Sequence, residues 1–137
     1  MRVPSAAMVE QIQPEGWAAP SGYAHGVLAR GWLLAIAGQI GAPPDGPVVA
    51  GGIVPQFEQA LANVGQVIEA AGGQIDNVIS MTVYVVDRAA YVAARAELGE
   101  VWQRRVGRRY PAMTLVEVKG LLTKGAVVEV QALAVLP

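Results

Sequence analysis

The sequence of 137 residues contains no cysteine and a single histidine, His25. The absence of cysteine excludes disulfides, thiolate catalysis and metal sites built on sulfur. One histidine cannot form a His cluster for a transition metal, and no serine stands on a recognisable nucleophile elbow for a Ser/His/Asp triad. Most familiar catalytic constellations are therefore excluded, and we expect no metal site.

Charged residues are also scarce, at 15% of the chain against 53% hydrophobic residues. Soluble domains carry roughly 25% charged residues, so too little charge is present here to cover a compact monomer. We therefore expect an oligomer that buries flat apolar faces. A membrane span is the other use of apolar surface, but no run approaches the ~18 uninterrupted apolar residues it requires. Because the N-terminus also lacks the pattern of a signal peptide, we expect a soluble, cytoplasmic protein.

Basic residues are scattered except in the stretch RRVGRR, and the formal net charge is −1. Such a cluster can contact phosphates, but no aromatic residues are interleaved with it and the chain is mildly acidic. We interpret it as the solvated end of a helix, and nucleic acid is a disfavoured partner. The arginines concerned are Arg104, Arg105, Arg108 and Arg109.

The length fits one domain, which we place at residues 21–137 after an irregular N-terminal arm over residues 1–20. The arm has room for a short edge strand. Apolar periodicity then predicts an α+β fold whose two helices pack on one face of a sheet, while partner subunits cover the other face. The expected elements are a strand over 32–37, a surface loop over 41–52, a helix over 55–71, a central strand over 77–87, a helix over 91–106, and strands over 113–119 and 126–135.

Alternation along the last strand places Glu129 and Gln131 on one face, among apolar neighbours. Burying a carboxylate and an amide costs free energy unless both are hydrogen-bonded. The pair therefore either lines a solvated pocket or is a structural pair that satisfies its own hydrogen bonds. Alternation likewise places Met113 and Leu115 on a common face of the preceding strand.

The motif GYAHG precedes the first predicted strand. Gly22 and Gly26 would allow a tight turn that directs Tyr23 or His25 towards a cleft. A lone histidine near a strand is more often a surface or interface residue than a catalyst. His25 is nevertheless the one side chain whose unperturbed titration falls between pH 5 and 8.

Six motifs then occur in order from about Pro20 to the end of the chain: GYAHG, AIAGQIG, FEQALANVGQVIEAAGG, VISMTVYVVDRAAY, YPAMTLVEV and VVEVQALAV. In this set and spacing the chain resembles the RidA family (YjgF-type, formerly L-PSP endoribonuclease). The resemblance implies a chorismate-mutase-like α+β sandwich, with a mixed sheet and two helices on one face. It also implies a homotrimer with a central β-barrel and small-molecule pockets at the subunit interfaces.

The best-known members of that family are imine deaminases, which hydrolyse 2-aminoacrylate-type intermediates to 2-keto acids and ammonia without a cofactor. An arginine binds the substrate carboxylate bidentately, and a glutamate on the last strand orients the attacking water. The resemblance matches Tyr23 and Gly38 to the tyrosine and glycine of that site. It departs elsewhere, because the serine, arginine, cysteine and catalytic glutamate are replaced by Ala37, Met113, Leu115 and Gln131. Glu129 matches a family glutamate that is not the catalytic one.

Loss of the arginine should weaken carboxylate binding by several kcal/mol, on the order of hundreds-fold. Gln131 can orient a water but cannot accept its proton. We therefore do not expect the standard deaminase reaction. If the protein is catalytic, we expect cofactor-free hydrolysis at a C=N bond, or related enamine/imine chemistry, on a less anionic substrate. Glu129 or His25 would carry the proton and Gln131 would position the water.

Three alternatives remain open. The protein could be a catalytically silent metabolite sensor or an accessory protein to another enzyme. An endoribonuclease is the weakest of these, because a second histidine and a basic groove are missing. Within the resemblance, the family's asparagine on the second helix is matched by Arg95, which either supplies a new anion-binding group or is simply an exposed helix residue.

Overall fold

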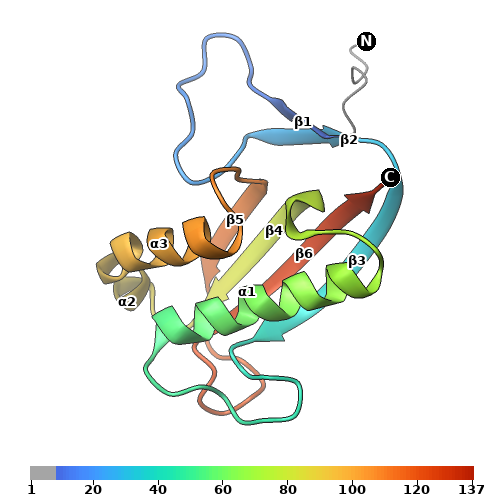
Figure 1. Cartoon of the computed structure of the whole chain (residues 1–137). Helices are drawn as coiled ribbons and strands as arrows, with labels where there is room; N and C mark the ends of the chain where they lie inside the picture. The colour runs from blue at the N-terminus through green and yellow to red at the C-terminus, as the bar shows by residue number, and fades with distance from the viewer. Residues whose placement is uncertain (1–8) are drawn as a thin grey trace.

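The computed structural model describes residues 9–137. In chain order its elements are β1 (Val9–Ile12), β2 (Gly26–Ala29), β3 (Trp32–Ile40), α1 (Ile53–Ala70), the short 3-10 turn η1 (Ile75–Asn77), β4 (Val78–Val85), α2 (Arg88–Ala93), α3 (Arg95–Arg105), β5 (Ala112–Glu117) and β6 (Val128–Leu136) (Figure 1). The predicted α+β class is confirmed.

The main sheet has the strand order β3-β6-β4-β5. The β4 and β5 strands run parallel, and the other two pairs are antiparallel, so the sheet is mixed as expected. The parallel pair is possible because α2 and α3 form the crossover between its strands. The strand predicted over 77–87 is therefore central, between β6 and β5.

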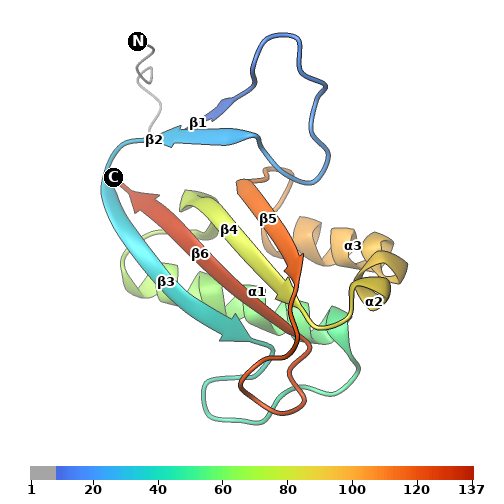
Figure 2. The same ribbon diagram turned by 180° about the vertical axis from the view of Figure 1, so that it is seen from behind.

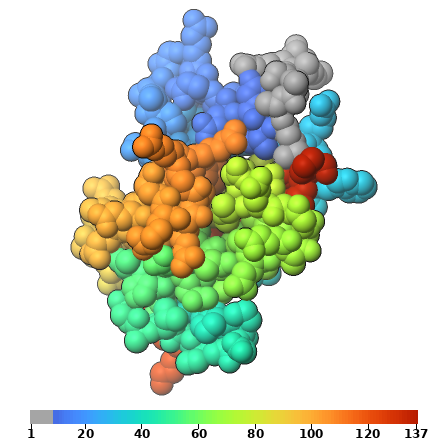
Figure 3. Space-filling model, in the orientation of Figure 1, coloured from blue at the N-terminus to red at the C-terminus, as the bar shows by residue number. Residues whose placement is uncertain are grey.

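The helices cover one face of this sheet. Figures 1 and 2 show α1 and α3 on that face, and in the described part of the chain no helix lies on the opposite face, which we call the bare face. Figure 3 shows the surface of α1, in green, beside that of the end of α3, in orange. The trimer and the central barrel stay predictions.

The hydrophobic core lies between the sheet and these helices. Its largest fully buried side chains come from α1, α3 and alternate positions of β4 and β6: Leu61, Val64, Ile68, Met81, Val83, Val85, Val101, Val128 and Val130. The period of two along β6 buries Val128, Val130 and Ala132 towards the helices. It thereby turns Glu129 and Gln131 to the bare face.

The prediction of one helix over 91–106 was wrong. The segment forms α2 and α3 instead, with a break at Ala94, whose ψ is 6° rather than helical. The Asp87 side chain accepts a hydrogen bond from the Ala90 amide at 3.1 Å and starts α2 earlier than expected. The break places Arg95 at the first position of α3.

The N-terminal segment is only partly irregular. β1 pairs with β2 in a separate two-stranded sheet, rather than extending the edge of the main sheet. The β2 strand was not predicted. Residues 1–8 of the predicted arm lie outside the described residues, and the proposed domain boundary at residue 20 stays a prediction.

The arginines at the end of α3 bind a carboxylate of α1. Arg104 Nη2 lies 2.9 Å from Glu58 Oε1, and Arg105 Nε lies 2.9 Å from Glu58 Oε2. The hydrogen bond from Arg104 lowers the pKa of the Glu58 carboxyl. Two of the four arginines therefore share one carboxylate at an exposed helix end, which agrees with the interpretation of RRVGRR as the end of a helix.

None of the helices formed by residues 9–137 is long and apolar enough to cross a membrane. In the same residues no group of three or more His, Cys, Asp and Glu side chains is arranged to hold a metal ion. The cytoplasmic location stays a prediction.

Candidate functional site

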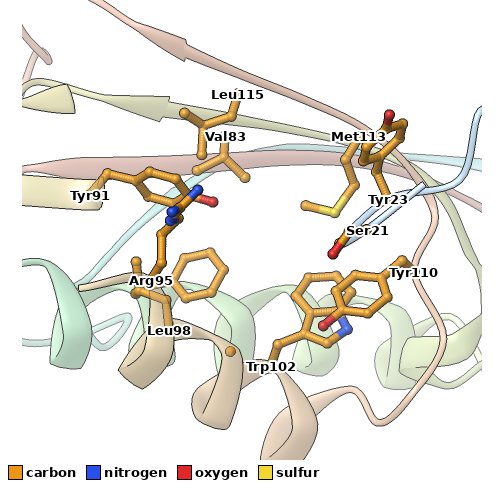
Figure 4. A pocket seen from close by; sticks show the side chains of 13 residues that line it. Ser21, Tyr23, Val83, Tyr91, Arg95, Leu98, Trp102, Tyr110, Met113 and Leu115 are labelled. Atoms are coloured by element: carbon orange, nitrogen blue, oxygen red, sulfur yellow. The ribbon is translucent and has the colours of Figure 1, made fainter. Parts of the chain in front are cut away.

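A cleft of about 630 Å³ lies between the helices α1 and α3, the strands β4 and β5, and the loop before β2 (Figure 4). It is lined by Ser21, Gly22, Tyr23, Phe57, Val83, Tyr91, Arg95, Leu98, Gly99, Trp102, Tyr110, Met113 and Leu115. Four of the residues predicted for the site are in this set: Tyr23, Arg95, Met113 and Leu115.

Met113 and Leu115 reach the cleft because of the strand register. In the parallel pair, Met113 lies beside Met81 and Leu115 beside Val83. Met81 and Val83 are buried towards the helices, so their neighbours on β5 point to the same side. The sheet wall of the cleft is consequently apolar.

Aromatic rings form the opposite wall. The Trp102 and Tyr110 rings are stacked, with centroids 5.0 Å apart and planes inclined by 7°. Trp102 Nε1 donates to the Arg109 carbonyl at 3.1 Å, which fixes the indole plane. Phe57 and Tyr91 also face the cleft. At the sequence level, Trp102 and Tyr91 were placed in the expected helix over 91–106 but not in the site. Tyr110 was missed, although it is the first residue of the YPAMTLVEV motif.

Tyr23 and His25 emerge from the turn that GYAHG predicts. Gly22 has a φ of 80°, which favours glycine, whereas Gly26 begins β2 without such a conformation. The His25 ring meets Tyr23 and Trp17 edge-on, at centroid distances of 5.3 and 4.9 Å. His25 faces a neighbouring hollow beside β1 and not the cleft.

The remaining predicted residues lie together on the bare face. The β3–β6 register shifts between Ile36 and Gln39, which leaves Ala37 and Gly38 opposite Gln131. A Cβ atom on Gly38 would collide with the Glu129 carboxylate, so glycine at position 38 makes room for that side chain. Gly38, Glu129 and Gln131 line a shallow hollow that also contains Tyr84.

Tyr84 was missed at the sequence level. Its hydroxyl donates a hydrogen bond to Gln131 Oε1 at 2.9 Å. The alternation that turned Met81 and Val83 inward also turns Tyr84 outward, so the period-two pattern of β4 could have identified it. Because the Gln131 carbonyl oxygen accepts from Tyr84, its amide nitrogen is directed elsewhere as a donor.

Within one chain, the predicted site residues therefore form two separate groups. The cleft group (Tyr23, Arg95, Met113 and Leu115) and the bare-face group (Ala37, Gly38, Glu129 and Gln131) lie on opposite faces of the sheet. A small ligand cannot contact both groups of the same chain.

Comparison with known proteins places the chain among relatives of similar length. A RutC family protein of Pyrococcus horikoshii is 36% identical over 128 residues, which cover 93% of this chain and 98% of the relative. The 2-iminobutanoate/2-iminopropanoate deaminase of Capra hircus is 36% identical over 101 residues, which cover 73% of this chain and 70% of that enzyme.

Solved structures agree with the fold. The structure of YyfB from Yersinia pestis, described as a protein of unknown function of the conserved Rid protein family, matches with a TM-score of 0.83 and 28% identity over 95% of this chain and 100% of that chain. The family model described as Endoribonuclease L-PSP matches residues 15–136. The chain therefore belongs to the Rid (YjgF, L-PSP) family.

Proposed function

We propose that this Rid-family chain forms a homotrimer whose small-molecule sites lie between copies, with the cleft of one chain facing the bare face of the next. We further propose that these sites do not run the standard hydrolysis of anionic imines. The observation that carries the second proposal is the position of Met113. It lines the cleft at the place where the family resemblance puts the substrate-binding arginine.

The bare face supports assembly. Leu33, Val116 and Leu133 are 67%, 38% and 38% exposed there, and no helix of the described chain covers them. Leu33 and Leu133 lie on the neighbouring strands β3 and β6, and exposed apolar surface on an uncovered sheet face is typical of an interaction site. A trimer that closes these faces into a central barrel would bury them, and it would bring the cleft and bare-face groups of neighbouring chains together.

The bare-face group determines which chemistry is available. Glu129 is its carboxylate, and in the proposed site it carries the proton. Gln131, held by Tyr84, positions water by hydrogen bonding but does not remove its proton. His25 is a weaker candidate for proton transfer because its ring is packed between Trp17 and Tyr23. The proposed reaction is cofactor-free hydrolysis at C=N, or enamine/imine chemistry, on a substrate that is less anionic than a short imino acid.

One observation favours a non-catalytic alternative. With Gln131 bound to Tyr84 and Ala37 lacking a hydroxyl, the water-activating groups that the resemblance implies are absent from the bare-face group. Such a site can bind a metabolite without converting it, as a sensor or an accessory protein would. A ribonuclease is less well supported, because Arg104 and Arg105 are bound to Glu58 and the chain has one histidine.

Ammonia release from enzymatically generated 2-aminoacrylate tests this proposal. We expect a rate at least roughly a hundredfold below that of a family member carrying the arginine, since a charge-assisted bidentate contact is missing. A rate equal to that of the arginine-bearing enzyme would refute the proposal. An absence of ammonia release combined with tight binding of a small metabolite would favour the alternative that the protein is a metabolite sensor.

A further inference from the structure

We propose that Arg95 binds a carboxylate at the α3 end of the cleft, and that the ligand carries an aromatic ring that lies against Met113 and the Trp102–Tyr110 stack. This inference rests on the proposed function only in taking the cleft as the ligand site. It differs from the proposed function in the charge of the ligand, because an aryl carboxylate carries the same charge as a short imino acid, and it places that charge at Arg95 instead of position 113.

Arg95 is suited to this role by its surroundings. Among the described residues that line the cleft it is the one charged side chain, and no Asp or Glu is in that set. The ion pairs resolved within residues 9–137 join Glu58 to Arg104 and Arg105 and do not involve Arg95. Its guanidinium is thus available, and its planar fork matches the geometry of a carboxylate.

The two ends of the cleft differ in chemistry. Figure 4 shows Arg95 beside Tyr91 at one end, and Met113, Tyr23 and Tyr110 at the other. The second end has a stacked indole and phenol and a thioether, and sulfur and aromatic groups both pack favourably on aromatic rings. A ligand with a charge at one end and a ring at the other would match both.

The size of the cleft supports a ligand larger than a short imino acid. Its volume of about 630 Å³ lies in the range typical of sites for drug-sized molecules. A short acid bound at Arg95 would leave the surface of Met113, Trp102 and Tyr110 hydrated. A ring on the ligand would displace that water and bury the apolar surface.

This placement reverses the ligand relative to the arrangement that the family resemblance implies. There the carboxylate would bind at position 113 on β5, whereas here it binds on α3 across the cleft. The apolar part of the ligand then faces Met113. In this chain the charged group lies on the helix wall of the cleft and the apolar group on the strand wall. This placement explains why Arg95 and Met113 occur together.

Calorimetric titration with three probes tests the proposal: phenylacetate, its uncharged analogue phenylacetamide, and the short acid 2-oxobutanoate. We expect the wild type to bind phenylacetate more tightly than either of the others. Arg95→Gln should weaken phenylacetate binding by roughly tenfold to a hundredfold and leave phenylacetamide binding unchanged. Arg88→Gln is the matched control, because Arg88 begins α2 outside the cleft and should have no effect.

Equal affinity of the wild type and Arg95→Gln for phenylacetate would overturn the proposal. So would equal affinity of the wild type for phenylacetate and phenylacetamide, or failure of phenylacetate to bind. These outcomes are distinguishable from failure of the proposed function, because the oligomeric state does not depend on which residue binds the carboxylate, and Gln131 limits ammonia release whether or not Arg95 binds it.

Discussion

Replacing Met113 by arginine is expected to raise the affinity for 2-oxobutanoate by roughly a hundredfold. The side chain at position 113 lines a cleft of about 630 Å³ that contains no Asp or Glu among its described residues, so a guanidinium there would have space and no competing acid. A charge-assisted bidentate contact contributes on the order of 2–3 kcal/mol, which corresponds to this gain. Calorimetry with 2-oxobutanoate measures it directly.

Met113→Gln is the control for this variant, because it adds polarity at position 113 without charge and should give little gain. Ammonia release by Met113→Arg should rise less than the affinity does, since Gln131 still cannot act as a base. Unchanged binding of 2-oxobutanoate by Met113→Arg would show that position 113 does not face the ligand. The proposal that Met113 prevents the standard deaminase reaction would then fail.

Replacing Leu133 by glutamate is expected to dissociate the proposed trimer into single chains of 14.3 kDa. Leu133 lies on the bare face beside Ala35, and in a closed trimer three carboxylates would be brought into an apolar interior. Burying unpaired charges of one sign costs several kcal/mol for each, which opposes closure of the trimer. Light scattering coupled to size-exclusion chromatography gives the mass.

Val67→Glu is the matched control for this second variant. Val67 lies on α1 and is 36% exposed, close to the 38% of Leu133, but on the helix side of the molecule. It should keep the mass of the wild type. If Leu133→Glu also kept that mass, the bare face would not be the assembly surface.

Much of the fold could be predicted because apolar periodicity is local. The β-branched run of β4 and the alternation of β6 identified the two central strands, and the alternation also placed Glu129 and Gln131 on one face correctly. The break at Ala94 could not be predicted, since no proline or glycine marks it and alanine favours an unbroken helix. The pairing of β1 with β2 depends on contacts between distant segments, for which the sequence carries no clear signal.

The candidate site was predicted as a list of residues but not as an arrangement. Alternation fixes which residues share a face of one strand, but it does not say which face of the sheet the helices cover. The register of β5 against β4 determines that Met113 points to the helix-covered face. The irregular pairing of β3 with β6 determines that Gly38 lies on the bare face. The aromatic wall was missed because Trp102 and Tyr110 meet only after the chain leaves α3 and turns back.

Chemical crosslinking tests the central claim most directly, because the natural chain has no cysteine and positions 113 and 131 lie on opposite faces of its own sheet. We expect a Met113→Cys/Gln131→Cys double variant, treated with a short bismaleimide, to form covalently joined species of two and three chains on a denaturing gel, while each single variant stays at the mass of one chain. A double variant that also stays at the mass of one chain would contradict a site shared between copies.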